Sequence, residues 1–207
     1  MFRKIIISFV VLSLVSILGT AASGQIFSIY TDLSDTKCRT LEIDEEGASS
    51  YRGDCGGVFG YKLHVIEGDL RQTIDIISPD GKTHELQFWN FFGGFSAVGP
   101  RAEWRIRSKK PTALIVRLNV GEDPEDSSKT TSYLIVAKIT ENEVCVTDIL
   151  KPTRSQNIEA RRSADRAAAM PCKKPYYEQV SDMAFSHQMQ EQAEIPAFLH
   201  LKWNVSF

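Results

Sequence analysis

The sequence predicts a mainly β fold: an antiparallel sandwich or barrel of about eight strands, with one C-terminal α-helix packed on the sheet. Three observations support this prediction. Apolar and polar residues alternate through much of residues 25–150, turn-forming segments separate the short runs, and the period becomes helical after Pro152. Short strands at close spacing are typical of sandwiches and barrels.

The alternation places the strands individually. We expect them at residues 59–65, 73–76, 84–90, 102–107, 113–120, 132–139 and 144–150. The segment 79–82, Pro-Asp-Gly-Lys, has hairpin chemistry, because proline presets φ and glycine accepts the left-handed region. Residues 113–120 are almost continuously apolar, which predicts a central strand covered on both faces.

The helix is expected to begin at a capping box formed by Thr153 and Gln156 and to end before Pro171. Alanines at one helical spacing would let it lie close on the sheet. These are Ala160, Ala164, Ala167 and Ala168. On its other faces, the spacing predicts two pairs within the helix, Glu159 with Arg162 and Arg161 with Asp165.

The first 24 residues have the pattern of a secretory signal peptide. Arg3 and Lys4 precede an uncharged run, residues 5–18, and small residues follow at 19–24. An uncleaved membrane anchor is the alternative, but a spanning helix needs about 20 apolar residues. We therefore expect three parts: a leader at 1–24, a disulfide-bonded domain at 25–172, and a polar linker with a strand-like tail at 173–207. The expected location is periplasmic or secreted.

Export would make the four cysteines disulfide partners. Of three pairings, the sequence-local one is favoured, Cys38–Cys55 and Cys145–Cys172. The chain has no C-x-x-C motif, which disfavours thiol redox chemistry, and no metal-ligand spacing. We expect no metal and no cofactor. A net charge of −2 gives no electrostatic reason to bind nucleic acid.

An aromatic run at residues 88–95 is the first candidate binding site. Glycines flank it, which predicts a loop at a strand end, where rings can stack on a sugar or receive a partner's side chain. The candidate residues are Trp89, Phe91, Phe92 and Phe95. The alternative is a hydrophobic cap on the core, although four large rings in five positions cannot all face inward from one strand.

A glycine-rich segment at residues 47–57 is the second candidate. Within the expected first disulfide, its Tyr51 and Arg52 would project from a constrained loop into a partner's cleft. The segment is loosely similar to the Ser/Tyr loops of bacterial periplasmic lysozyme inhibitors, so an inhibitor-like role is one form of the binding hypothesis. An ordinary surface loop is the alternative.

The C-terminal segment alternates apolar and polar residues up to a terminal aromatic residue, and resembles the closing strand of bacterial outer-membrane barrels. Its apolar positions are Leu199, Leu201, Trp203, Val205 and Phe207. We expect an added strand or docked tail of a soluble domain; outer-membrane association through the tail is the alternative. On this second hypothesis the protein is an envelope structural or assembly protein.

Catalytic signatures are weak. The four histidines lie in separate segments and no G-x-S-x-G motif is present, so no catalytic residue is predicted. The leading hypothesis is an exported, non-catalytic binding module for an extracytoplasmic protein or glycan. An unrecognised hydrolase is the third hypothesis.

Several segments together resemble a family of exported bacterial proteins with no assigned function. They are residues 53–63, 102–105, 133–139, 145–148, 160–165 and 171–172. The resemblance runs from about Tyr30 to Cys172, and the tail departs from it. It implies an extracytoplasmic bacterial setting and structural cysteines, and it supplies no active site.

Overall fold

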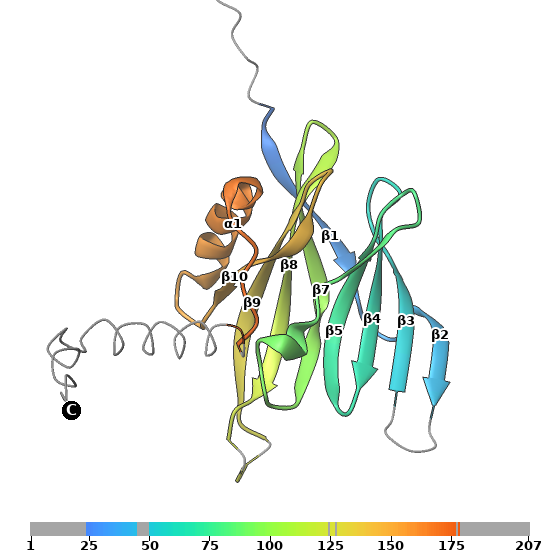
Figure 1. Ribbon diagram of the computed structural model, residues 1–207, viewed down its shortest axis with the longest axis vertical. Helices are drawn as coiled ribbons and strands as arrows, with labels where there is room; N and C mark the ends of the chain where they lie inside the picture. The colour runs from blue at the N-terminus through green and yellow to red at the C-terminus, as the bar shows by residue number, and fades with distance from the viewer. Residues whose placement is uncertain (1–23, 45–49, 124, 127, 177, 179–207) are drawn as a thin grey trace, which may run out of the picture.

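The computed structural model describes residues 24–44, 50–123, 125–126, 128–176 and 178. Most of the predicted leader and all five apolar tail residues, Leu199, Leu201, Trp203, Val205 and Phe207, lie outside this range. Ten strands and one α-helix form the described domain (Figure 1). The strands are β1 (Ile26–Asp32), β2 (Arg39–Asp44), β3 (Ser50–Gly56), β4 (Lys62–Gly68), β5 (Arg71–Ile77), β6 (Thr83–Glu85), β7 (Ser96–Arg107), β8 (Lys110–Gly121), β9 (Thr130–Ile139) and β10 (Val144–Leu150), and the helix is α1 (Gln156–Arg166).

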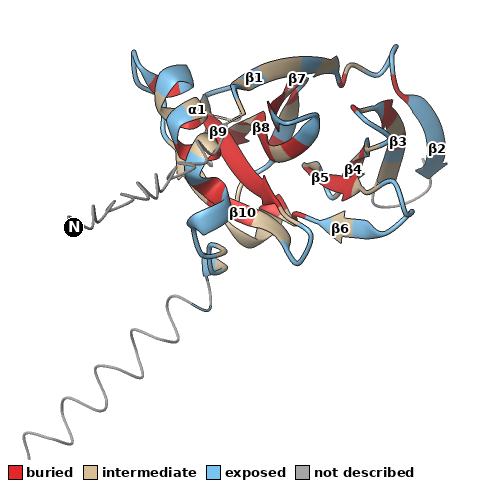
Figure 2. Ribbon diagram, turned by 90° about the horizontal axis from the view of Figure 1, so that it is seen from above, coloured by how far each residue is buried: buried red, intermediate tan, exposed pale blue. Residues whose placement is uncertain are grey.

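All ten strands belong to one sheet, in the order β10-β9-β8-β7-β5-β4-β3-β2, with β1 paired to β7 and β6 paired to β5. The pairing is antiparallel except where Arg71 of β5 meets Ser96 of β7 in parallel, so the sheet is mixed. The sheet wraps around the core without closing (Figure 2). The predicted mainly β fold with one packed helix is confirmed, with more strands than the eight expected.

Strand β8 is covered on both faces, as its apolar run predicted. Leu114, Val116 and Leu118 join the main core inside the wrapped sheet. Ala113 and Ile115 point the other way and pack with residues of β9 and α1 in a second, smaller cluster. One strand therefore joins the two layers of the domain.

The predicted turn at residues 79–82 is confirmed, but an unexpected turn after it shortens the strand expected at 84–90. Gly81 has φ 85° in the turn between β5 and β6, as predicted for the segment 79–82. Strand β6 ends at Glu85, because Gln87 takes a left-handed φ of 45° and a short 3-10 turn, η1 (Phe88–Asn90), follows. The expected strand 84–90 is wrong in its second half, although Phe88 is fully buried as expected.

Helix α1 begins later than the capping-box pattern predicted. Its N-cap is Ser155, without a side-chain cap, and Thr153 lies outside the helix. Gln156 is buried instead, and its Nε2 donates to the carbonyl oxygens of Ser132 (2.9 Å) and Leu150 (3.0 Å). The capping-box prediction is wrong because this amide anchors the helix to β9 and the end of β10.

The small face of α1 lies on the sheet. Ala160, Ala164 and Ala167 are at most 2% exposed, whereas the fourth predicted residue, Ala168, is exposed. Because alanine lacks a long side chain, the helix approaches β8 and β9 closely (Figure 1). After α1 the chain makes a further 3-10 turn, η2 (Ala167–Ala169), and then extends to Cys172.

Two charged residues of α1, Arg161 and Asp165, pair with the sheet and not with each other, and no ion pair joins the other two described residues predicted to pair, Glu159 and Arg162. The Arg105 guanidinium on β7 bonds the Asp165 carboxylate through Nε (2.7 Å) and Nη2 (2.9 Å). Arg161 Nε bonds Glu103 Oε1 at 2.6 Å. The structure therefore uses Arg161 and Asp165 to dock the helix, where the sequence spacing had suggested a pair within it.

Both disulfides are the pairs predicted from the sequence. Cys38–Cys55 joins the segment before β2 to β3, and Cys145–Cys172 joins β10 to the chain after η2. Near the second bridge, the Lys173 N–H donates to the Val146 carbonyl at 2.7 Å. Closing the 17- and 27-residue separations stabilises the domain by about 3 kcal/mol each in the chain-entropy model.

Replacing Asp165 with alanine should lower the free energy of unfolding by about 2 kcal/mol, because Arg105, 8% exposed, loses its bidentate carboxylate. Asp165 is itself one-third exposed, which keeps the cost below that of a fully buried pair. Urea denaturation followed by circular dichroism measures the change. Arg162→Ala, at an exposed position of the same helix, should change stability by less than about 0.5 kcal/mol; equal losses in the two variants would contradict this docking role.

Candidate functional site

The predicted aromatic run separates into rings with different environments. Phe88 is in the core, and its N–H donates to Thr73 Oγ1 at 3.0 Å. Phe91 and Phe92 are half-buried and pack against the core, and Trp89 is also half-buried. Phe95 is 55% exposed. The run is therefore both a cap on the core and a source of one projecting ring.

The backbone around Phe95 is fixed on both sides. The Phe95 carbonyl accepts the Gly121 N–H at the end of β8 (2.9 Å), and the Ser96 N–H donates to the Leu70 carbonyl (3.1 Å). At Gly94, a Cβ would lie 1.9 Å from the Gly121 oxygen, so only glycine permits this close approach. The exposed ring thus projects from a pre-organised base.

Leu70 forms the opposite apolar wall and has an unusual backbone. It follows Asp69 in the two-residue turn between β4 and β5, and both residues have positive φ, 54° for Asp69 and 57° for Leu70. Such turns favour Asn or Gly at these positions. Leu70 is 54% exposed, so it combines a strained conformation with little burial. Stability of the fold does not explain a leucine here.

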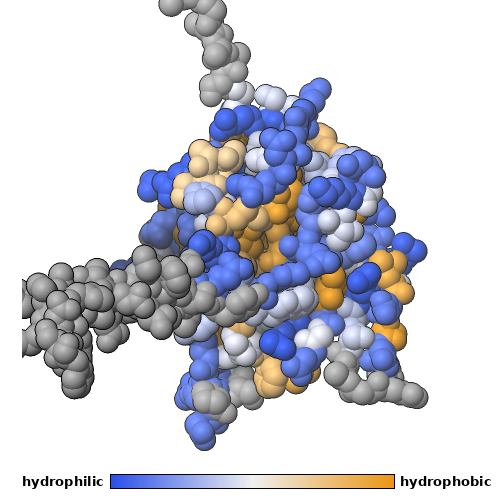
Figure 3. All heavy atoms as spheres, in the orientation of Figure 1, coloured by the Kyte–Doolittle hydropathy of each residue, from blue (hydrophilic) through white to orange (hydrophobic). Residues whose placement is uncertain are grey.

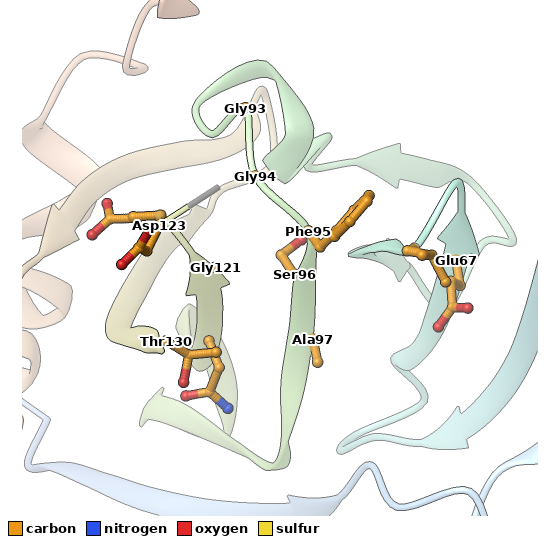
Figure 4. Close-up of a pocket in the computed structure, with 12 residues that line it drawn as sticks. Glu67, Gly93, Gly94, Phe95, Ser96, Ala97, Gly121, Asp123 and Thr130 are labelled. Atoms are coloured by element: carbon orange, nitrogen blue, oxygen red, sulfur yellow. The ribbon is translucent and has the colours of Figure 1, made fainter. Parts of the chain in front are cut away.

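A cleft of about 740 Å³ opens between these two apolar side chains. Three carboxylates also line it: Glu67 from β4, and Glu122 and Asp123 from the chain after β8. Figure 4 shows Phe95 between Glu67 on one side and Asp123 on the other. We call this the aromatic cleft. Among the described residues, no lysine, arginine or histidine lines it.

Glu122 connects the cleft with two smaller hollows behind the aromatic loop. These have volumes of about 290 and 360 Å³, and both are lined by Phe91, Phe92 and Tyr176. The rings of Phe92 and Tyr133 lie 4.8 Å apart at an interplanar angle of 51°, and the Tyr133 hydroxyl donates to the Glu122 carboxylate. All four predicted residues of the aromatic run line the cleft or these hollows.

These contacts fix the charge of the site at neutral pH. Hydrogen bonds from Thr131 and Tyr133 lower the pKa of Glu122, so this carboxylate stays ionised. Burial, followed by the bond to Glu122, raises the pKa of Tyr133 to about 12 and keeps its hydroxyl protonated. Asp123 is also ionised, because hydrogen bonds from Lys129 and the Glu125 N–H lower its pKa. The cleft is apolar in its walls and negative at its rim.

The second candidate binding site, Tyr51 and Arg52, does not have the expected conformation. Tyr51 and Arg52 lie in strand β3, hydrogen-bonded between β2 and β4, and not in a loop; the loop assignment is wrong because residues 50–56 extend as a strand. Tyr51 is the register partner of Glu67, and its half-buried ring packs against the core beside the cleft without lining it. Arg52 faces the other side of the sheet.

That other side carries a row of ionisable groups across four strands. Asp54, His64, Asp75 and Glu85 are successive register partners on β3, β4, β5 and β6. His64 Nε2 lies 3.8 Å from Asp54 Oδ1, and burial lowers the pKa of His64 against the attraction of Asp54. Burial, then repulsion by Glu85, raises the pKa of Asp75 to about 6. Neither His64 nor His84 lines the cleft.

The described residues contain one group of potential metal ligands, Glu143, Cys145 and Cys172. Its two sulfurs are joined in a disulfide and are not available as thiolates. Within the same described range, no helix combines the length and apolarity that crossing a membrane requires.

Comparison with known proteins finds no matching family model, no matching curated protein and no matching solved structure. The class is therefore defined by the fold and the cleft alone: a disulfide-bonded, mainly β domain with an aromatic cleft at one end of its sheet. Two disulfides indicate an oxidising environment.

The sequence does not identify Glu67, Leu70, Glu122 or Asp123 as residues of the site. Each is distant in sequence from the aromatic run and reaches it through strand pairing. A sequence signal existed for Leu70, since a two-residue Asp-Leu turn between strands forces a leucine into the left-handed region.

Replacing Leu70 with glycine should raise the free energy of unfolding by about 0.5 to 1 kcal/mol, because glycine accepts φ 57° without strain. Leu70→Ala retains the strain and should give no such gain. Thermal and urea unfolding of the two variants make the comparison. A destabilising Leu70→Gly would show that the Leu70 side chain supports the fold, and an equal gain in Leu70→Ala would show that backbone strain is not the cause of the gain.

Replacing Asp75 with asparagine should raise the free energy of unfolding more at pH 7 than at pH 4. Below about pH 4 the carboxyl is protonated in both the folded and the unfolded chain. Between about pH 4 and 6 the unfolded chain releases the proton first, so the native residue loses stability as pH rises. The variant should gain about 2 to 3 kcal/mol at pH 7 over its difference at pH 4. Urea denaturation at both pH values tests this, and a pH-independent difference would contradict it.

Proposed function

We propose that this protein is an exported, non-catalytic binding module that holds a segment of an extracytoplasmic protein in the aromatic cleft. The observation that carries the proposal is the exposed pair Phe95 and Leu70, held on a fixed backbone above a carboxylate-lined cleft. Exposed aromatic and aliphatic side chains on a rigid base lose little entropy on binding. They are typical anchors of protein interfaces.

The charge of the cleft favours a basic partner. Glu67, Glu122 and Asp123 line it, and Lys129, which bonds Asp123 at 3.0 Å, lies outside the cleft lining. A partner segment that presents lysine or arginine next to an apolar side chain would meet both the rim and the walls. A glycan would use the ring and the carboxylates but would leave the negative charge unpaired.

The described lining of the cleft does not pair a hydroxyl or thiol nucleophile with a histidine or lysine base, which supports a binding role over a serine- or cysteine-type hydrolase. Ser96 and Thr130 are the hydroxyl-bearing residues of the lining, and no histidine, lysine or cysteine of the described part of the chain accompanies them there. The lysozyme-inhibitor hypothesis required Tyr51 and Arg52 to project from a loop. Both residues are in strand β3, so this form of the binding hypothesis is not supported.

Export is supported by the two disulfides and by the leader pattern of residues 1–24. From these together we propose a periplasmic or secreted location, which the family of exported bacterial proteins that residues 30–172 resemble would share. Docking through the tail remains a prediction, because residues 199–207 lie outside the described range.

Figure 3 shows that most of the viewed surface is polar, with apolar side chains gathered near its centre and at the β2 end.

Binding can be tested with three probes: an alternating Leu-Lys octapeptide, its Leu-Glu counterpart, and a chitin-type oligosaccharide. We expect saturable amide shifts at Leu70, Phe95 and Glu122 with the Leu-Lys peptide only, because the cleft is negative. Phe95→Ala should weaken that binding at least tenfold, a loss of about 1.4 kcal/mol. Added salt should weaken it further.

The matched control is Phe59→Ala, since Phe59 is similarly exposed (48%) and does not line the cleft. It should leave peptide binding unchanged. Equal losses in both variants, or no saturable binding of the Leu-Lys peptide, would overturn the proposal. Binding of the oligosaccharide in place of the peptide would assign the cleft to a glycan and refute a protein partner.

A further inference from the structure

A separate hollow, of about 290 Å³, lies between α1 and the sheet, away from the aromatic loop. It shares no lining residue with the aromatic cleft. It forms where β7 changes register against β8 between Val98 and Ala102, so that residues 99–101 bulge from the ladder. Buried side chains at the bottom of the hollow are apolar, namely Ile115, Leu134 and Ala160. We call it the arginine hollow, after the three arginines described next.

Arg101, Arg117 and Arg161 line the hollow together with a single carboxylate, Glu103. That carboxylate is already neutralised, because Arg161 bonds it through Nε (2.6 Å) and Nη2 (3.3 Å). Burial opposes ionisation of Glu103, but the bonds from Arg161 and Ser28 outweigh it and lower the pKa of Glu103. The two other guanidinium groups give the hollow a net positive charge in a protein whose overall charge is −2.

Arg117 is the decisive residue. It lies on the helix-facing side of β8, is half-buried, and has no carboxylate within ion-pair distance among the described residues. Its Nη1 donates to two neutral oxygens, Ser132 Oγ (2.8 Å) and Gln156 Oε1 (3.4 Å). Holding a guanidinium partly out of water is costly without an anion, and neutral acceptors compensate only part of that cost.

Arg101 stands at the rim of the hollow and is exposed. Asp32, its register partner on β1, does not form an ion pair with it; the Asp32 carboxylate accepts hydrogen bonds from Ser34, at 2.8 Å from N and 2.6 Å from Oγ. The exposed amide of Asn157, in the first turn of α1, completes the polar rim. The positive end of a helix dipole favours an anion on this side.

We propose that the arginine hollow binds an oxyanion, a carboxylate or phosphate group, carried on a small apolar body. The guanidinium groups of Arg117 and Arg101 bond the anion, since planar donor forks match carboxylate and phosphate oxygens. The apolar body rests on Ile115 and Leu134. The volume is at the lower end of the range for small-molecule sites.

Titration with benzoate and phenyl phosphate tests the proposal, with acetate and inorganic phosphate as probes of the anion alone and benzamide as the neutral isostere. We expect saturable amide shifts at Arg101, Ile115 and Asn157 with benzoate or phenyl phosphate, and weaker binding of the bare anions. The tighter of the two aromatic probes identifies the carboxylate or the phosphate as the preferred group. Benzamide should bind at least tenfold more weakly, and salt should weaken anion binding.

Arg117→Gln should weaken the preferred probe at least tenfold. Because Arg117 also touches Ser132 and Gln156, Arg101→Gln provides a second variant, at an exposed position whose side chain forms no ion pair with the described residues. It should weaken binding at least threefold. Arg107→Gln, at an exposed arginine of the same strand outside the hollow, is the control and should bind normally. The proposal would be overturned by any of three results. Benzamide could bind as tightly as benzoate, neither aromatic anion could give a saturable shift, or both test variants could bind normally.

Discussion

Strand β8 imposes the constraint on which the rest of the structure depends. It is apolar on both faces, so each face must be covered. The sheet supplies one cover by wrapping around Leu114, Val116 and Leu118, and the alanine face of α1 supplies the other over Ala113 and Ile115. Both candidate sites are consequences of this arrangement. The aromatic cleft lies at the end of β8, and the arginine hollow lies where α1 leaves its helix-facing side uncovered.

The helix is held to that face by polar as well as apolar contacts. Buried alanines allow close approach but specify position weakly, because one small residue resembles the next. The ion pairs of Arg105 with Asp165 and of Arg161 with Glu103, and the two bonds from Gln156, define the register. A buried ion pair adds little net stability over an apolar equivalent, but breaking one is costly, so these contacts disfavour other positions of the helix.

The aromatic cleft combines two properties that usually oppose each other, a rigid base and exposed apolar walls. Rigidity comes from backbone hydrogen bonds on both sides of Phe95 and from the close approach at Gly94. Exposure comes from the left-handed conformation at Leu70, which directs a strained residue outward. Strain of this kind persists where the surrounding structure determines the backbone, and it is common at binding sites.

The sequence by itself determined the features that depend on neighbours along the chain: most of the strands from β4 to β10 from period two, the two-faced strand β8, the hairpin at Gly81, the sequence-local disulfides and the alanine face of the helix. The tertiary structure alone decided which distant groups meet. It moved Arg161 and Asp165 from a pair within the helix to partners on β7, used Gln156 as an anchor, and placed Tyr51 in a strand. It also brought Glu67, Leu70 and Glu122 to Phe95. The reason is physical: periodicity reports which face a residue occupies, whereas contacts across the sheet depend on register, turn conformation and the path of the chain between strands.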